Sequence, residues 1–343
     1  MPSPAAPRYV FLSYLICNTM YKSEELLKKV NEALDGLTYD RKPFSLYEPI
    51  QYVLAIGGKR VRPVLMMLAY NLYKEDPERI IKQAIGLETY HNFTLLHDDL
   101  MDNADMRRGH ETVHKRWNPN QAILSGDTML LQAFERVEDC DVAYVKDVFA
   151  TFLTTTYEIG EGQQLDVEFE TRNDVTEDEY IEMIRLKTSV LLACAVKIGA
   201  ILAGASKEDQ ENLYKFGEQI GLAFQLQDDL LDVYGDPKVF GKNIGGDITS
   251  NKKTYMLINA VNRANEAQRK ELMGWIDAKD FDRNEKVKAV TRLYDEIGIR
   301  KLCEQKMEEC YTLALEYLAK VNVPEERKTE LKAYAADMMK RQS

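Results

Sequence analysis

The sequence is poor in the residues that build disulfide frameworks and histidine-rich metal centres. Its five cysteines are odd in number, widely spaced and without a CxxC pair, as is typical of reduced packing residues in a cytosolic protein. Only four histidines are present, and all of them lie in the first third of the chain. The sequence therefore disfavours a disulfide-bonded secreted fold, and we expect a cytoplasmic protein.

Positive charge and long apolar runs are also scarce. The chain carries 45 lysines and arginines against 56 aspartates and glutamates, a formal net charge of -11, which disfavours nucleic acid as a partner. The early apolar run at residues 9–17 is far too short to cross a bilayer, so no stable membrane anchor is expected. Any bound phosphate group would need a local cluster of cations.

No linker divides the chain into halves. Met20 stands directly before a well-formed amphipathic segment, so we interpret residues 1–19 as a disordered or mis-annotated N-terminal extension. A secretory signal is the weaker alternative for that extension. We expect residues 20–343 to form a single domain, which is long enough to bury a core.

Segments with the alternating pattern of strands are missing as well, apart from a doubtful pair at residues 239–240. Apolar residues instead recur at helical spacing, which predicts helices over residues 24–34, 47–56, 59–73, 79–102, 122–140, 144–169, 176–203 and 206–234, with several more towards the C-terminus. A capping-box pattern at Thr176 and a further cap pattern at Ser206 mark two of the helix starts. The predicted fold class is all-α.

Two aspartate-rich motifs of the same form occur in these predicted helices. They are DDLMD at residues 98–102 and DDLLD at residues 228–232. In each motif the first and last aspartates stand at i and i+4, on one face of a helix, and the second aspartate is turned by about 100°. Like charges at this spacing weaken a helix by roughly a few tenths of a kcal/mol, so a positive partner is expected.

The apolar flanks of both motifs indicate buried helices. Phe93 and Leu96 precede the first motif, and Phe224 and Leu226 precede the second. Buried carboxylates must be paired, hydrogen-bonded or bound to metal. Oxygen ligands without thiolates or a histidine cluster suit Mg²⁺, which shares its coordination with water and phosphate oxygens.

Three cationic segments are candidates for phosphate binding. They are the junction GGKRVRP (residues 57–63), the RRG segment that follows the first motif (residues 107–109) and a polar loop (residues 241–253). The junction places Lys59, Arg60 and Arg62 beside free backbone N–H groups at a helix start. Arginine suits bidentate phosphate contact, and the lysines of the polar loop could close over an anion. Taken alone, each segment is equally compatible with an ordinary solvated loop.

Taken together and in this order, the features resemble the trans-isoprenyl diphosphate synthases, also called polyprenyl synthases. The resemblance runs from about Met20 to the C-terminus and rests on both aspartate motifs, GGKRVRP, MRRG, GQQLD, Lys187-Thr188, Phe224-Gln225 and the Lys242/Lys252 loop. It implies an isoprenoid-synthase bundle of helices around one deep central cavity, in a homodimer. The implied activity is Mg²⁺-dependent head-to-tail joining of isopentenyl diphosphate to an allylic diphosphate (dimethylallyl, geranyl or farnesyl).

The resemblance also implies a role for each candidate residue. The direct ligands of a cluster of three Mg²⁺ ions would be Asp98, Asp102 and Asp228, and metal-bound water would be hydrogen-bonded by Asp99, Asp229 and Asp232. The allylic diphosphate would be held by Arg107, Lys187, Lys242 and Lys252, and isopentenyl diphosphate by Lys59, Arg62, His91 and Arg108. The forming carbocation would be faced by Thr188 and Gln225, with Gln163 and Asp166 in support. The choice between Lys252 and Lys253 stays open.

Product length should depend on the side chains beneath the first motif. Phe93 and Thr94 lie five and four residues before Asp98, so on a helix they point down the same wall as the aspartates. A bulky residue beside a small one resembles the enzymes that make geranylgeranyl diphosphate. Farnesyl diphosphate or a longer polyprenyl product is the alternative.

Several other functions compete with this interpretation. The dyad at His97 and Asp98 suggests a His-Asp phosphohydrolase, but that class needs further histidine ligands and leaves the second motif unexplained. Terpene cyclases share one aspartate-rich helix, but their second metal motif mixes Asn, Ser or Thr with Glu. A non-catalytic partner subunit of a heteromeric prenyl synthase typically loses an aspartate motif, and here both are whole. Carboxylates that cluster by chance are the least favoured explanation.

Overall fold

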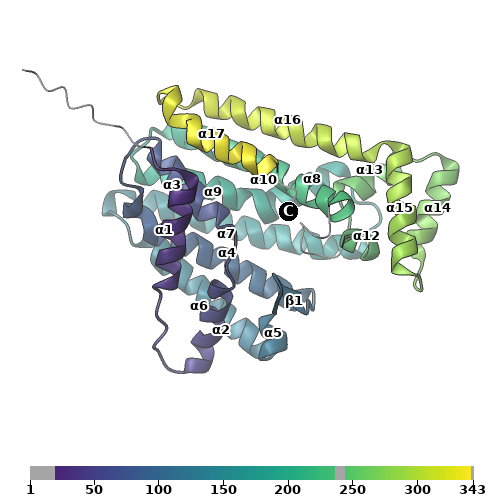
Figure 1. The fold of residues 1–343 in the computed structure, drawn as a ribbon, viewed down its shortest axis with the longest axis horizontal. Helices are drawn as coiled ribbons and strands as arrows, with labels where there is room; N and C mark the ends of the chain where they lie inside the picture. The colour runs from purple at the N-terminus through teal and green to yellow at the C-terminus, as the bar shows by residue number, and fades with distance from the viewer. Residues whose placement is uncertain (1–19, 236–243, 341–343) are drawn as a thin grey trace, which may run out of the picture.

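The computed structural model describes residues 20–235 and 244–340. The predicted N-terminal extension, the doubtful strand at residues 239–240 and the candidate Lys242 lie outside the described residues. Figure 1 shows a bundle of helices in which the N-terminal part of the chain (purple to blue) lies at one end and helices α13–α15 at the other.

The first group of elements runs from the N-terminal helix to the helix that carries the second aspartate motif. They are α1 (Ser23–Asp35), α2 (Phe44–Ala55), α3 (Val61–Asn71), the 3₁₀ helix η1 (Pro77–Ile80), α4 (Ile81–Met101), α5 (Val113–Arg116), α6 (Pro119–Glu138), α7 (Val142–Thr171), α8 (Glu177–Ile184), the π-helical turn η2 (Arg185–Ser189), α9 (Val190–Leu202) and α10 (Lys207–Tyr234). The C-terminal elements are α12 (Gly246–Thr249), α13 (Tyr255–Arg263), α14 (Glu266–Asp277), α15 (Arg283–Ile297), α16 (Ile299–Lys320) and α17 (Glu325–Met339). The all-α prediction is confirmed.

One detail of that prediction is wrong, because a small hairpin follows α4. Strands β1 (Met106–Arg107) and β2 (His110–Glu111) pair antiparallel across a turn in which Arg108 and Gly109 both have positive φ. Two-residue turns of this kind join tight hairpins. Two-residue strands are too short to produce an alternating pattern, so sequence periodicity does not reveal them.

The predicted helix starts are confirmed by their caps. The Thr176 side chain accepts from the Glu179 N–H within a full capping box, and the Ser206 hydroxyl accepts from the Asp209 N–H. The helix predicted over residues 176–203 is instead interrupted, since η2 forms a π-helical turn between α8 and α9. Such turns are rare and occur frequently at functional sites.

The core consists of two hydrophobic clusters that share α10 and α16. Phe216 and Ile220 of α10 belong to the first cluster, with α1–α7 and α9, whereas Leu226 belongs to the second, with α13–α15. Helix α16, which lies along one side of the bundle in Figure 1, packs against α10 and also contributes to both clusters. The second aspartate motif therefore sits on a helix held over most of its length.

Two further expectations concern cysteines and membranes. Cys194, Cys303 and Cys310 are buried as free thiols, as expected for packing residues, while Cys17 lies outside the described residues. Among the described helices, none combines the length and the hydropathy that a bilayer crossing requires.

Candidate active site

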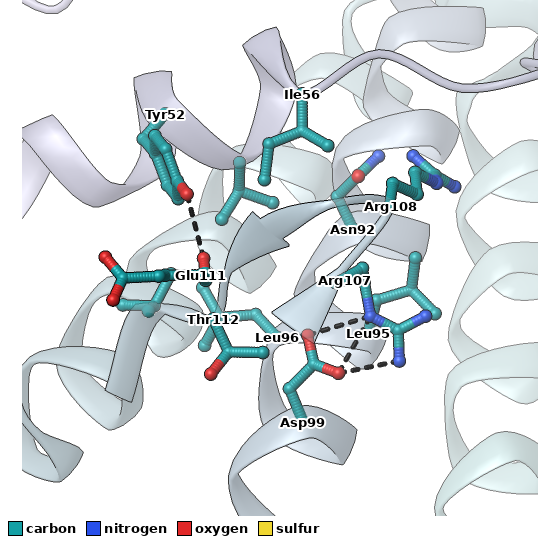
Figure 2. Close-up of a pocket in the computed structure, with 12 residues that line it drawn as sticks. Tyr52, Ile56, Asn92, Leu95, Leu96, Asp99, Arg107, Arg108, Glu111 and Thr112 are labelled. Carbon is teal, nitrogen blue, oxygen red and sulfur yellow. Dashed lines mark hydrogen bonds and ion pairs between the residues drawn. The ribbon is translucent and has the colours of Figure 1, made fainter. Parts of the chain in front are cut away.

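The first aspartate motif occupies the C-terminal end of α4. Asp98 is half-buried, with Oδ1 3.7 Å from Nζ of Lys187, and Asp102 is exposed as the residue that ends the helix. Asp99 is only 5 % exposed and faces the hairpin, where its two oxygens accept from Arg107 at 2.7–2.8 Å (Figure 2). The second aspartate therefore points away from the first, as the helical spacing predicts. It forms an ion pair of its own.

The second motif lies at the C-terminal end of α10. The buried carboxylate of Asp229 accepts from the hydroxyl of Tyr180 and, at 3.1 Å, from Nε2 of Gln225. One carboxylate oxygen of Asp232 accepts from the backbone N–H of Asp247 at 2.9 Å, and Asp228 is half-buried. The motif is thereby connected to α8 and to the short helix α12.

Two lysines and one aspartate join the two motifs. Nζ of Lys187 lies 2.6 Å from a carboxylate oxygen of Asp166 and Nζ of Lys252 lies 3.8 Å from the same oxygen. Burial acting alone would lower the pKa of Lys252, but the carboxylates of Asp166, Asp247, Asp229 and Asp102 together raise it. Aspartates of both motifs therefore favour the charged form of Lys252.

The π-helical turn η2 directs two of the candidate side chains to this region. Lys187 and Thr188 both belong to the turn, and Oγ1 of Thr188 lies 3.0 Å from Oε1 of Gln225 on α10. The turn fits because Gly162 of α7 and Gly221 of α10 face it without side chains. A Cβ at Gly162 would lie 2.3 Å from the backbone nitrogen of Lys187.

Of the cationic candidates for isopentenyl diphosphate, Arg62 and Arg108 both lie close enough to His91 to affect its pKa. A cavity of about 20 Å³ is lined by residues of α2, α4 and the hairpin, among them Asn92, Asp99, Arg107 and Arg108 (Figure 2). The hairpin is tied to α2 by Tyr52, whose hydroxyl donates to the Glu111 carbonyl at 2.8 Å.

His91 lies within this cationic group. Burial and the guanidinium groups of Arg62 and Arg108 hold the pKa of His91 well below its ordinary value. The imidazole is therefore neutral at pH 7 and can donate one hydrogen bond without adding charge. Lys59, exposed in the junction, is the fourth candidate of the set.

The structure changes the interpretation of three cationic candidates. Arg60, grouped with Lys59 as a possible phosphate ligand, is buried and forms an ion pair with Glu88 at 2.8 Å, so that prediction is wrong. Of the two competing lysines, Lys252 lies near the aspartates. Lys253 lines a separate cavity beside α13 and α14.

The residues predicted to limit the product lie deeper along α4. The Phe93 ring is half-buried between the rings of Tyr90 and His97, at centroid distances of 5.5 and 4.7 Å. Tyr90 in turn packs against the fully buried Phe152. Oγ1 of Thr94 donates to the carbonyl of His91 one turn back, which leaves its methyl group as the outward-facing surface.

Comparisons with known proteins agree with this arrangement. The family model of polyprenyl synthetases matches residues 44–294. A short chain isoprenyl diphosphate synthase of Methanocaldococcus jannaschii is 39% identical over 285 residues, which are 82% of this chain and 86% of that protein. The chain belongs to the polyprenyl synthetase family. It is accordingly a trans-prenyltransferase of the short-chain class.

Solved structures and further relatives of this polyprenyl synthetase extend the comparison. A crystal structure of a geranylgeranyl pyrophosphate synthase superposes with a TM-score of 0.90 at 40% identity, covering 94% of this chain and 100% of the other. The geranylgeranyl diphosphate synthase of Methanosarcina mazei is 45% identical over 234 residues, 67% of this chain and 72% of that protein. Other relatives are named for farnesyl and geranylfarnesyl products, so membership of the family does not fix product length.

The carboxylates of this polyprenyl synthetase fit Mg²⁺. Burial raises the pKa of Asp98 although Lys187 and Arg107 act to lower it, and burial together with the carboxylate of Asp247 raises the pKa of Asp229, so both sites favour additional positive charge. In the described part of the chain, no three His, Cys, Asp or Glu side chains form a ready metal cluster. Mg²⁺ is commonly held by one or two carboxylates plus water and phosphate oxygens, and the two motifs supply such carboxylates.

A related structure shows the same metal with a substrate. The geranylgeranyl pyrophosphate synthase of Corynebacterium glutamicum, in complex with isoprenyl diphosphate and magnesium, matches with a TM-score of 0.82 at 26% identity over 93% of this chain and 98% of that one.

Sequence analysis gave no role to Tyr180 or Asp247, which hold the second motif. Asp247 stands in the polar loop that the sequence singles out, so a search of that loop for a partner of the motif could have found it. Tyr180 has no such signal, because nothing in the spacing distinguishes it from any other buried tyrosine of a helix.

Proposed function

We propose that this polyprenyl synthetase condenses isopentenyl diphosphate head to tail (1'–4) with an allylic diphosphate and that its main product is geranylgeranyl diphosphate. The observation that carries the proposal is that Lys187, which pairs with Asp98 of the first motif, shares Asp166 with Lys252, whose pKa is raised by aspartates of both motifs. Paired carboxylates facing a shared set of cations provide both the metal and the diphosphate sites that such a reaction requires. We also propose that residues 20–343 form one domain, since α10 and α16 contribute to both core clusters.

The metal would be held by Asp98, Asp102 and Asp228, with Asp99, Asp229 and Asp232 as supporting acceptors. Three Mg²⁺ ions, when bound, supply positive charge to the diphosphate that departs from the allylic substrate. The chain adds positive charge at the same place through the set proposed for the allylic diphosphate, Arg107, Lys187, Lys242 and Lys252. Arg107 is prepared for this role because Asp99 fixes the orientation of its guanidinium group.

Isopentenyl diphosphate would bind to Lys59, Arg62, His91 and Arg108. Its double bond then attacks the allylic carbocation, which Thr188 and Gln225 face with oxygen atoms from η2 and α10. Apolar walls around α4 exclude water, which would otherwise capture the cation. Loss of a proton to the released diphosphate restores an alkene that is one isoprene unit longer.

Product length follows in this proposal from Phe93 with Thr94 beside it. The support is the packing of the Phe93 ring on Tyr90, which itself rests on Phe152. A growing chain that descends along α4 therefore meets a layer of aromatic rings rather than an open channel.

We further propose a homodimer formed through α6. Leu124 and Leu131 lie two turns apart on one face of α6 and are 55 % and 70 % exposed, beside the exposed Ile123. Tyr157 and Val142 of the neighbouring α7 are exposed as well. Exposed apolar side chains gathered on one helix face are typical of a protein interface, and a second copy of the chain is the occupant that the family resemblance implies.

The decisive experiment is an incubation of the purified protein with Mg²⁺ and isopentenyl diphosphate. Dimethylallyl, geranyl and farnesyl diphosphates are supplied in separate reactions, and product length is read by mass spectrometry. A dominant geranylgeranyl product is expected. Farnesyl or longer products would contradict the proposed product length, and no elongation with any primer would favour the partner-subunit alternative over the enzyme.

A further inference from the structure

The junction between α2 and α3 has an unusual backbone. Gly57 and Gly58 have φ of 86° and 150°, and Arg60 has φ of 48°. Glycine adopts positive φ readily, but a long side chain with a Cβ adopts it at a cost. Arg60 must therefore be held in place by contacts that outweigh this cost.

The contacts of Arg60 are all internal. Its guanidinium group donates to Oε1 of Glu88 at 2.8 Å and to the carbonyl of Leu54 at 2.7 Å, with a longer contact of 3.4 Å to Oδ1 of Asn31. The side chains of Arg60 and Glu88 are 3 % and 2 % exposed. A buried ion pair is weak evidence for stability, because desolvating two charges offsets their attraction. The pair thus invites an explanation other than stability.

The junction is clamped from both sides. Arg60 ties it to the end of α2 and to Glu88 on α4, and Glu88 also accepts from Nδ2 of Asn92 at 3.1 Å. From the opposite side, Arg108 of the hairpin donates to the carbonyl of Gly57, and its guanidinium group occupies the space where a Cβ of Gly58 would be. A side chain at this position would displace the guanidinium group of Arg108.

These contacts hold the segment that carries Lys59 and Arg62, two of the residues proposed to bind isopentenyl diphosphate. Lys59 directly precedes Arg60 along the chain, and Arg62 follows it in the first turn of α3. His91 lies three residues after Glu88 on α4, and Arg60 contributes to the low pKa of His91. The buried pair is therefore connected, through one or two residues, to three of the four proposed ligands.

We propose that Arg60 and Glu88 are positioning residues for the isopentenyl diphosphate site: the ion pair fixes the junction so that Lys59 and Arg62 face the substrate, without touching it. This inference rests on the proposed roles of Lys59 and Arg62. The inference thus assigns a function to Arg60, which lies too deep in the core to bind a phosphate.

The test is Glu88→Gln, which keeps the size of the side chain but removes the charge that compensates Arg60. Steady-state kinetics with Mg²⁺, isopentenyl diphosphate and geranyl diphosphate should show a KM for isopentenyl diphosphate raised about tenfold and a KM for geranyl diphosphate changed less than about twofold. Equal changes in both KM values, or no change in either, would overturn the inference.

Two further variants separate positioning from general loss of stability. Glu330→Gln removes a carboxylate that links α17 to the start of α1, far from the junction, and should lower the melting temperature without changing either KM. If Glu88→Gln does not fold, Arg60→Lys takes its place, because it retains the charge but loses the donor to Leu54. Arg60→Lys should raise the KM for isopentenyl diphosphate and not that for geranyl diphosphate. An equal rise in both KM values would overturn the inference. Wild-type protein that fails to elongate any primer would refute the proposed function instead.

Discussion

At the scale of single residues, neighbouring aspartates of one motif have different surroundings. Asp99 is matched by Arg107 in a bidentate ion pair, whereas among the described residues Asp98 pairs with Lys187 at 3.7 Å, and Lys187 is shared with Asp166. Burial consequently raises the pKa of Asp98. A carboxylate left short of positive charge is available to a metal ion, and one that is fully paired is not.

The first prediction concerns Asp98→Asn. The variant should lower kcat by a factor on the order of 10² or more, because a metal ligand is lost at the departing diphosphate. Its stability without Mg²⁺ should be unchanged or higher, since a raised folded-state pKa means that the charged carboxylate is disfavoured by folding at pH 7. Turnover rates and denaturant unfolding measure the two effects. Full activity would refute the metal assignment.

Phe93→Ala provides the second prediction. Removing the ring leaves Tyr90 as the next obstacle along α4, so the product should gain at least one isoprene unit, read by mass spectrometry. Thr94→Ala is the matched control, because alanine keeps a small residue beside Phe93 and the lost hydroxyl is bonded to its own helix, so product length should stay unchanged. An unchanged product from Phe93→Ala would mean that another element limits the chain.

At the scale of elements, the π-helical turn depends on close helix approach. Gly162→Ala would place a Cβ 2.3 Å from the backbone nitrogen of Lys187 and 2.8 Å from Leu186, so backbone atoms must move. We expect a loss of stability of about 1–3 kcal/mol and a clear fall in kcat, because Lys187 and Thr188 shift together.

Gly160→Ala is the control for that prediction, on the same helix two residues away. A Cβ at Gly160 meets nothing within 4 Å, so the substitution should stabilise α7 by about 0.5–1 kcal/mol and leave kcat unchanged. Denaturant unfolding measures the stability of both variants, and turnover rates measure their kcat. A Gly162 variant that behaves like the Gly160 variant would show that the turn tolerates displacement.

The contact between the terminal helices α17 and α1 gives a pH-dependent prediction. Burial alone would raise the pKa of Glu330, but the Ser23 N–H and the Lys22 ammonium group stabilise its carboxylate and lower the pKa. Because the folded-state pKa lies below the unfolded one, this stabilisation is complete above the ordinary glutamate pKa and is lost as the pH falls through the folded value.

Glu330→Gln should therefore destabilise the protein by about 1–2 kcal/mol at pH 7, where charged hydrogen bonds are lost. Over roughly pH 3 to 5 the difference from the wild type should shrink, which denaturant unfolding at several pH values can measure. A difference that stays constant with pH would contradict the assigned pKa direction.

At the scale of the whole molecule, the proposed dimer predicts the effect of a charge on α6. Leu131→Glu should convert a dimer into a monomer, as measured by sedimentation equilibrium, because burying an unpaired carboxylate in an apolar interface is costly. Leu313→Glu on α16 introduces the same change on an exposed residue of another helix and should leave the mass unchanged. A wild-type protein that sediments as a monomer would refute the dimer.

Local patterns in the sequence were sufficient to predict most helices, whereas the metal-binding roles of the aspartates stay a prediction. Caps such as that of Thr176 and apolar periodicity depend on residues within one turn of each other, so they can be read without a fold. The same holds for the aspartates at i and i+4. The cytoplasmic location inferred from the cysteines stays a prediction.

What the sequence by itself determined was therefore the set of helices, the two carboxylate motifs and the family they indicate. Only the tertiary structure decided that Arg60 points into the core to meet Glu88, that Tyr180 holds Asp229, and that a π-helical turn carries Lys187. These depend on helices far apart in the chain packing side by side, at places such as Gly162 where a missing side chain allows it. Whether a cation meets solvent, a substrate or a buried carboxylate is settled by such packing, because the cost of burying its charge depends on every group around it.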